Sequence, residues 1–181
     1  MTSAHEIFIS VDVETSGPIP GEYSMLSIGA CLVDNDKRSF SALLKPVNRN
    51  ADPKALEVTG LSLDRLDLEG EDPALAMKRF ADWVAASTLD GGTPVFVGLN
   101  APFDWSFVNY YFHCFLGSNP FGFTSLDIKA FYMGATGCTW DETKSSAMAR
   151  ELKPALKSDH DALHDAQYQA ELFRLARGWK R

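Results

Sequence analysis

Residues 7–15, I-F-I-S-V-D-V-E-T, are the stretch that decides the fold. They are apolar and rich in β-branched residues up to Asp12, which predicts a buried strand over about residues 7–13. Because side chains alternate along a strand, Asp12 and Glu14 point to the same face. Buried carboxylates are costly unless they are paired or bound to a metal ion. The stretch therefore predicts either two carboxylates that converge on one cation, or a strand end that runs into solvent.

A second polar cluster follows another short strand. Residues 93–105, T-P-V-F-V-G-L-N-A-P-F-D-W, run from an apolar strand through Gly98 and Asn100 into a helix that we predict over residues 103–115. Asp104 falls in the first turn of this helix, where the helix dipole favours an acid whether or not the acid takes part in chemistry. Asn100 is likewise common in turns. A structural and a functional role both stay open for Asn100 and Asp104.

The third cluster lies near the end of the chain, where residues 160–166, H-D-A-L-H-D-A, open a helical run. The apolar stripe of this run consists of Ala162, Ala166, Ala170 and Phe173. Asp165 lies beside the stripe. His160 cannot share a face with Asp165 inside one helix, because an α-helix repeats every ~3.6 residues. We therefore expect His160 on the loop before the helix, with Asp161 as the N-cap.

A histidine beside a group of carboxylates can accept a proton near neutral pH, as a general base for a water nucleophile must. His160 is the residue that we predict for this role. His164 is the rival candidate. Its position inside the helix favours a surface or capping role instead.

The three clusters, D-x-E-T, N-A-x-F-D and H-x-A-x-x-D-A, resemble in order and separation the three exonuclease motifs of the DEDDh family. This family includes the proofreading subunit of bacterial replicative polymerases, RNase T and oligoribonuclease. The resemblance extends from Phe8 to Phe173. It implies an α/β protein with an RNase H-like fold, in which helices flank both faces of a mixed central β-sheet.

The resemblance also implies the chemistry of the site. Two divalent ions, Mg²⁺ or Mn²⁺, would grip the scissile phosphate about 4 Å apart. Asp12 would bridge both ions and Asp104 would support one of them, whereas Glu14 and Asp165 would complete the other. All these ligands are oxygen donors, which suits Mg²⁺ or Mn²⁺ better than zinc. His160 would deprotonate the attacking water, which makes the chain the histidine type of DEDD nuclease.

Relatives hold the terminal bases of the substrate with an apolar wedge after the first motif and with aromatic side chains near the second. Stacking of this kind tolerates any sequence, because every base has a π-face. Phe103 and Trp105 flank Asp104 and cannot both face the pocket, so we expect at least one of them in the core. The substrate-binding residues that we predict are Thr15, Met25, Leu26, Asn100, Phe103 and Trp105.

The activity implied by the resemblance is 3′-to-5′ hydrolysis of single-stranded RNA or DNA ends to nucleoside 5′-monophosphates. G-L-N-A-P-F-D-W-S-F is similar to the second motif of RNase T, whereas Thr15 stands where oligoribonuclease has Met. RNA, DNA or both stay open as substrates, since nothing in the sequence distinguishes recognition of the ribose 2′-hydroxyl. Similarity to RNase T also suggests a free-standing homodimer.

Two alternatives come from other classes of protein. One is a catalytically silent RNase H-like module that binds nucleic acid or a protein partner. Loss of an acidic ligand or of the histidine would mark such a module, and here all of these residues are present. The other is a phosphodiesterase that acts on small nucleotides, since minimal substrates need only the active-site pocket.

Composition fits a single exonuclease domain over residues 1–181. The 181 residues have 45% hydrophobic content, enough for a sizeable core. A net charge of −7 argues against a broad grip on long duplexes, because such affinity comes largely from Lys and Arg. No apolar run is long enough to span a membrane, and the N-terminus has no apolar signal region. The cysteines show no C-x-x-C spacing, so we expect a cytoplasmic location without disulfides or zinc.

The rest of the chain predicts further strands over about residues 25–33 and 39–45 and an amphipathic helix over residues 72–87. Residues 18–24 and the acidic stretch 63–71 are predicted as loops. Asp127 belongs to S-L-D-I-K-A-F, a predicted short strand and helix, and we interpret it as a structural residue.

Overall fold

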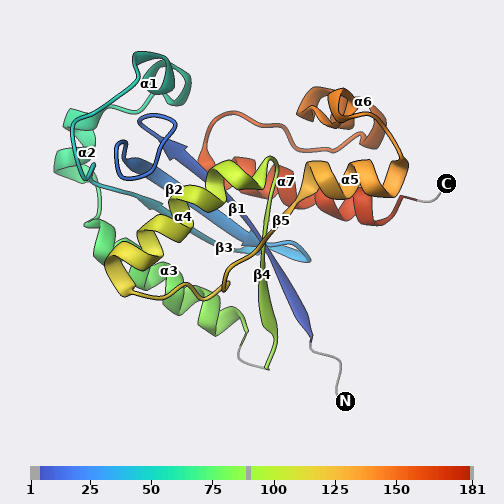
Figure 1. The fold of residues 1–181 in the computed structure, drawn as a ribbon, viewed down its shortest axis with the longest axis horizontal. Helices are drawn as coiled ribbons and strands as arrows, with labels where there is room; N and C mark the ends of the chain where they lie inside the picture. The colour runs from blue at the N-terminus through green and yellow to red at the C-terminus, as the bar shows by residue number, and fades with distance from the viewer. Residues whose placement is uncertain (1–4, 89–90, 180–181) are drawn as a thin grey trace.

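A central β-sheet organises the molecule, whose computed structural model describes residues 5–88 and 91–179 (Figure 1). Within these residues the sheet has five strands in the order β3-β2-β1-β4-β5. The strands are β1 (Glu6–Thr15), β2 (Met25–Leu32), β3 (Asn35–Leu43), β4 (Thr93–Gly98) and β5 (Ser125–Asp127). β2 pairs antiparallel with both β1 and β3, whereas β4 pairs parallel with both β1 and β5. The sheet is therefore mixed, as predicted.

Helices cover both faces of this sheet. They are α1 (Pro53–Thr59), α2 (Leu63–Glu69), α3 (Pro73–Ser87), α4 (Ala101–Leu116), α5 (Ile128–Thr136), the 3-10 helix η1 (Trp140–Thr143), α6 (Ser145–Leu152) and α7 (Ala162–Arg177). α3 and α4 share one hydrophobic core with the sheet, and α5, α6 and α7 share another. This confirms the predicted α/β arrangement. None of the described helices is both long and apolar enough to cross a membrane.

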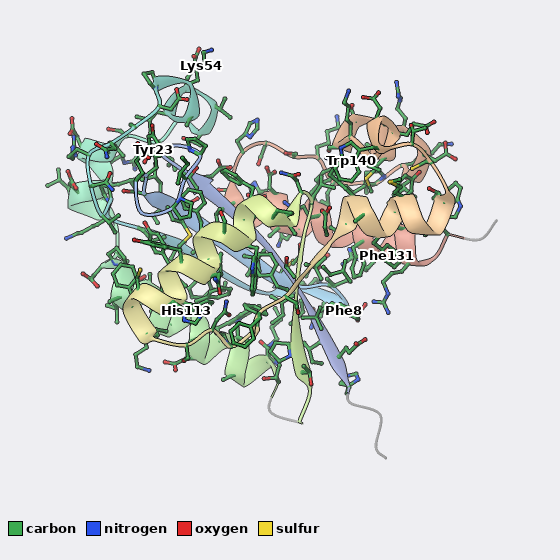
Figure 2. The ribbon with its side chains drawn as sticks, viewed as in Figure 1. Phe8, Tyr23, Lys54, His113, Phe131 and Trp140 are labelled. Carbon is green, nitrogen blue, oxygen red and sulfur yellow. The ribbon has the colours of Figure 1, made fainter. Side chains whose placement is uncertain are left out.

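The central strand β1 divides its side chains between the two cores. Those buried on the α3 and α4 side are Ile9, Val11 and Val13. Phe8 packs on the other side, where its ring and the ring of Phe131 both contact the ring of Phe173 in α7 (Figure 2). Because side chains alternate along a strand, Asp12 and Glu14 also point toward the α7 side.

The first turn of α7 lies directly against β2. Gly29 pairs with Asp12 across the sheet, and a β-carbon at Gly29 would lie 2.2 Å from the carbonyl carbon and oxygen of Ala162. Any side chain at position 29 would therefore push α7 away from the strand that carries Asp12. The face of α7 that packs on the sheet is buried as predicted and consists of Ala162, Ala166, Ala170 and Phe173.

One predicted loop is wrong, because residues 63–71 contain the helix α2. Ser62 accepts a hydrogen bond from the backbone N–H of Arg65 and caps this helix. Leu63 and Leu66 are buried in a small core with Leu26 of β2. The acidic side chains on the outer face of α2 dominate this stretch of sequence, so its short apolar face was not recognised and a loop was predicted. In addition, β3 begins earlier than residue 39, because the hairpin that joins it to β2 is short.

We predict that Gly29→Ala lowers the free energy of unfolding by about 1–3 kcal/mol, because the added methyl overlaps the backbone of α7. Thermal unfolding followed by circular dichroism measures this loss. Gly134→Ala is the matched control, since it adds the same methyl in α5 where nothing lies within 4 Å. Alanine is also the better helix former, so the control should be neutral or stabilising. Equal effects of the two substitutions would contradict the close approach of α7 to β2.

Candidate active site

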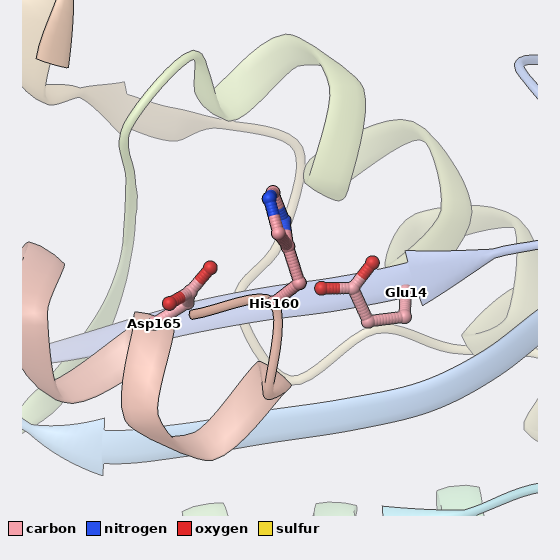
Figure 3. A group of neighbouring side chains, drawn as sticks. All are labelled: Glu14, His160 and Asp165. Atoms are coloured by element: carbon pink, nitrogen blue, oxygen red, sulfur yellow. The ribbon is translucent and has the colours of Figure 1, made fainter. Parts of the chain in front are cut away.

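The three polar clusters of the sequence meet at one end of the sheet. Asp12 and Glu14 lie on β1, Asp104 lies in the first turn of α4, and Asp165 lies in the first turn of α7. His160 is on the loop before α7, as expected. Ligand atoms of Glu14, His160 and Asp165 all lie within 4.8 Å of one another. Figure 3 shows His160 on its loop between the two carboxylates.

A tight turn between β4 and α4 places Asp104. Asn100 adopts a left-handed backbone conformation with φ 68°, which asparagine tolerates better than most residues. Asp127 accepts hydrogen bonds from the backbone N–H of Asn100 (2.9 Å) and of Ala101 (3.2 Å), which supports its structural interpretation. Asp104 is buried, and its Oδ1 accepts a hydrogen bond of 3.1 Å from the backbone N–H of Val13 in β1. The second motif is thereby joined to the first.

The loop before α7 is held by the carboxylate of Asp165. Ser158 Oγ donates to Asp165 Oδ2 at 2.8 Å, and the backbone N–H of Asp159 donates to Asp165 Oδ1 at 2.9 Å. His160 follows with φ 63°, in the left-handed region of the backbone, and its side chain is exposed. Asp161 then caps α7 by accepting hydrogen bonds from two backbone N–H groups of the first turn, as predicted. The histidine is therefore presented at the surface above Asp165.

His164 is engaged elsewhere. Its Nδ1 lies 3.0 Å from Asp159 Oδ2, and the side chain is exposed. This hydrogen bond, followed by the charges of Asp161 and Asp159, raises the pKa of His164 above its ordinary value. The contact favours the surface role that the sequence suggested for this residue.

The carboxylates are crowded and partly removed from water, which opposes their ionisation. Burial, followed by the charges of Asp104, Glu14 and Asp165, raises the pKa of Asp12 well above its ordinary value. Burial and the charge of Asp165 raise the pKa of Glu14 to about 8, and burial raises the pKa of Asp104 to about 7. A divalent cation would relieve this repulsion. The oxygen donors of the cluster fit hard cations.

Two of the predicted substrate-binding residues do not reach the surface. Met25 and Leu26 are both 0% exposed. Met25 belongs to the core beneath α4, and Leu26 packs against Leu63 and Leu66 of α2. Neither side chain can stack on a base in this conformation. The strand begins at Met25 as predicted, but the prediction failed because other elements cover both of its faces there, with Met25 in the core shared with α3 and α4 and Leu26 in the core shared with α2.

Phe103 lines a pocket of about 360 Å³ beside Glu14, whose other walls include Thr15, Pro18 and Val58. Thr15 is buried and its Oγ1 donates to the carbonyl oxygen of Gly17 at 2.9 Å, so the hydroxyl holds the loop after the first motif. Trp105 instead packs edge-on against Phe96 in the core, and the centroids of the two rings lie 5.2 Å apart. One of the two aromatics that flank Asp104 faces the pocket and the other packs in the core, as expected.

Pocket residues and side-chain partners that the sequence did not identify complete the site. A second pocket of about 560 Å³ beside Glu14 and His160 is lined by residues of β2, β3 and α1 that the sequence analysis did not single out. Ser158 holds Asp165, and Gln169 of α7 donates a hydrogen bond to Asp12. The sequence offered one signal for the contact with Asp12, which was a glutamine on the apolar side of the predicted C-terminal helix.

Carboxylates gathered from three motifs, with a histidine on the loop before the last helix, form the arrangement that the resemblance to DEDDh nucleases implies. The chain belongs to the RNase T exonuclease family, whose model matches residues 9–173. It is 57% identical over 175 residues to the 3′-5′ DNA exonuclease Cap18 of Escherichia coli, across 97% of this chain and 94% of that protein. The family model identifies the chain as an exonuclease, and the E. coli relative at 57% identity adds the 3′-5′ direction.

Solved structures share the fold at low sequence identity. The nuclease domain of 3'hExo, a DEDDh family member bound to rAMP, superposes with a TM-score of 0.78 at 16% identity, over 98% of this chain and 95% of that chain. The zinc-bound complex of E. coli exonuclease I with single-stranded DNA has a TM-score of 0.69 at 18% identity, over 96% of this chain and 41% of that chain. The predicted RNase H-like fold is therefore confirmed.

We predict that without divalent cations the protein loses stability as the pH rises from about 5 to about 9. A carboxyl whose pKa is higher in the folded state binds protons more tightly there, so its stabilising contribution is lost as the pH passes that value. For Asp104 and Glu14 these values are about 7 and about 8. Melting temperatures in EDTA across this range measure the effect.

Glu14→Gln should flatten this pH dependence, because the amide cannot ionise. Glu57→Gln, which changes an exposed residue of α1, serves as the control for the general effect of removing one negative charge. Identical pH slopes for the wild type and for both variants would contradict the crowding of the carboxylates.

Proposed function

We propose that this exonuclease removes nucleotides from the 3′ ends of single-stranded DNA with Mg²⁺ or Mn²⁺ as cofactor. The observation that carries the proposal is the convergence of Glu14, His160 and Asp165 within 4.8 Å, beside Asp12 and Asp104. DNA is favoured over RNA by the name of the E. coli relative, a DNA exonuclease at 57% identity. RNA stays as the second candidate substrate.

The carboxylates of Asp12, Glu14, Asp104 and Asp165 would hold two ions. When bound, such ions lower the pKa of a water molecule and stabilise the negative charge that develops on the leaving oxygen. The cluster is preorganised for this task, since the backbone N–H of Val13 orients Asp104, and Ser158 with the backbone of Asp159 orients Asp165.

His160 acts as the general base. Its exposed position on the loop, beside Glu14 and Asp165, lets an imidazole nitrogen take a proton from the attacking water. The water oxygen bonds to phosphorus while the bond from phosphorus to the 3′ oxygen of the preceding nucleotide breaks. A nucleoside 5′-monophosphate leaves, and the shortened strand keeps a 3′-hydroxyl.

The pocket beside Glu14 accommodates the terminal nucleoside. Phe103 and Val58 offer apolar contacts for a base, and stacking of this kind is independent of sequence. Lys54 of α1 lines the same pocket and supplies a positive charge there. With a net charge of −7 over the whole chain, such local contacts at a single-stranded end account for binding better than a wide basic surface.

A homodimer and a cytoplasmic location, both expected from the sequence, remain proposals. A catalytically silent module is disfavoured because Glu14, His160 and Asp165 lie together, and the charges of Glu14, Asp104 and Asp165 act on Asp12. A phosphodiesterase of small nucleotides is the alternative that uses the same site. It differs from the proposed exonuclease in requiring no contact beyond the terminal nucleotide.

We predict that 5′-labelled single-stranded DNA is shortened from its 3′ end in the presence of Mg²⁺ or Mn²⁺, and that Asp12→Ala and His160→Ala lose at least about 100-fold in rate. Gel analysis of the products gives the direction of degradation, and single-stranded RNA of the same sequence ranks the two substrates. His164→Ala is the matched control and should keep most of the activity. Intact oligomers with a cleaved dinucleotide would favour the small-nucleotide phosphodiesterase instead.

We also predict that Mn²⁺ or Mg²⁺ raises the melting temperature of the wild type, because the ions bind only the folded carboxylate cluster. At a free concentration of about 100 times Kd the stabilisation is about 2.7 kcal/mol. Asp12→Asn should remove most of the shift, while exchanging the exposed Asp82 for Asn should leave it in place. A shift that survives Asp12→Asn would place the ions elsewhere.

A further inference from the structure

A single buried side chain links the three motifs of the site. Gln169 lies on α7 about one helical turn after Asp165 and is 4% exposed. Its Nε2 donates to Asp12 Oδ1 on β1, and its Oε1 accepts a hydrogen bond of 2.8 Å from the backbone N–H of Leu99, the residue after β4. The amide thus contacts the helix, the central strand and the turn that leads to Asp104.

Burying the amide of Gln169 costs free energy, which indicates that this side chain does more than pack α7 on the sheet. A buried polar group destabilises the fold unless its donor and its acceptor both find partners. The neighbouring positions on this face of α7 are held by Ala166, Ala170 and Phe173, which pack without polar contacts. An apolar residue at position 169 would fill the space, but it would leave Asp12 without this donor and the backbone N–H of Leu99 without this acceptor. The glutamine is instead the right length to reach Asp12 and Leu99 at the same time.

A neutral donor has a particular advantage beside Asp12. Lysine or arginine would also bind this carboxylate, but their charge would compete with a cation for it. The amide of Gln169 donates one hydrogen bond to Oδ1 and leaves the charge in place. An ionised carboxylate offers about four lone-pair positions, so one can be used for orientation while the others remain for ions.

We propose that Gln169 is a positioning residue that orients the carboxylate of Asp12 for cation binding and couples it to the turn that carries Asp104. This inference rests on the proposed function in so far as Asp12 is a metal ligand. Gln169 does more than hold the carboxylate of Asp12, because it also accepts a hydrogen bond from the backbone N–H of Leu99. Leu99 directly precedes Asn100, so movement of β4 or α4 against β1 is resisted at the same side chain.

The test measures Mn²⁺ binding directly, by titration calorimetry of the full chain, in the wild type and in Gln169→Met. Methionine is unbranched and of similar length, but it offers no N–H donor. We expect the dissociation constant for Mn²⁺ to rise by about 10- to 100-fold, the usual effect of removing a partner of a metal ligand. The Mn²⁺ concentration that gives half-maximal exonuclease activity should rise by a similar factor, with a smaller change in kcat at saturating Mn²⁺.

Gln167→Met is the matched control. Gln167 lies on the same helix, but its amide donates to the backbone carbonyl of Asp36, away from the carboxylates. Its substitution should leave Mn²⁺ affinity unchanged. Gln169→Asn is the second variant, because it keeps an amide that is too short to reach both partners, and it should weaken Mn²⁺ binding as well. Melting temperatures in EDTA show that each variant is folded.

The outcomes separate the two proposals. If the wild type binds Mn²⁺ and folded Gln169→Met or Gln169→Asn binds it equally well, Gln169 only packs α7 on the sheet and the inference is overturned. If the wild type itself binds no Mn²⁺, the proposed function fails, and the role of Gln169 fails with it. Weakened binding in the Gln169 variants, with Gln167→Met unchanged, supports both.

Discussion

Repulsion among carboxylates at one end of the sheet is the constraint on which the rest of the site depends. Asp12 and Glu14 come from β1, Asp104 from α4 and Asp165 from α7, and the charges of the other three raise the pKa of Asp12. Such a cluster is unfavourable for the protein alone, because burial and like charge act in the same direction. The remaining structure must hold these groups together against that repulsion. A bound cation would make the electrostatic energy of the cluster favourable, because each carboxylate is attracted to the ion.

Neutral donors provide much of this restraint. The backbone N–H of Val13 holds Asp104, the amide of Gln169 holds Asp12, and Ser158 with the backbone N–H of Asp159 holds Asp165. None of these donors carries a charge, so the carboxylates keep theirs for a cation. Close packing supplies the rest, since α7 can reach the sheet beside Asp12 only because position 29 has no side chain.

The alternation of β1 was predictable because one face of this strand packs in an apolar core and the pattern of residues 7–15 records it. The cap of α7 followed from Asp161 for a similarly local reason. Where the prediction failed, the cause was not local. Whether Met25 and Leu26 face a substrate or the core depends on what α2 and α4 cover, which no short window of sequence contains.

The sequence by itself determined which residue types carry the chemistry, their order along the chain and the secondary structure on which each lies. These properties depend on strand alternation, helix capping and recognisable motifs, all of which act over a few neighbouring residues. Only the tertiary structure decided that Phe103 and not Trp105 faces the pocket, and that Gln169 reaches both Asp12 and Leu99. Such contacts depend on the packing of α4 and α7 against β1 and β4, because they join residues that lie far apart in the chain.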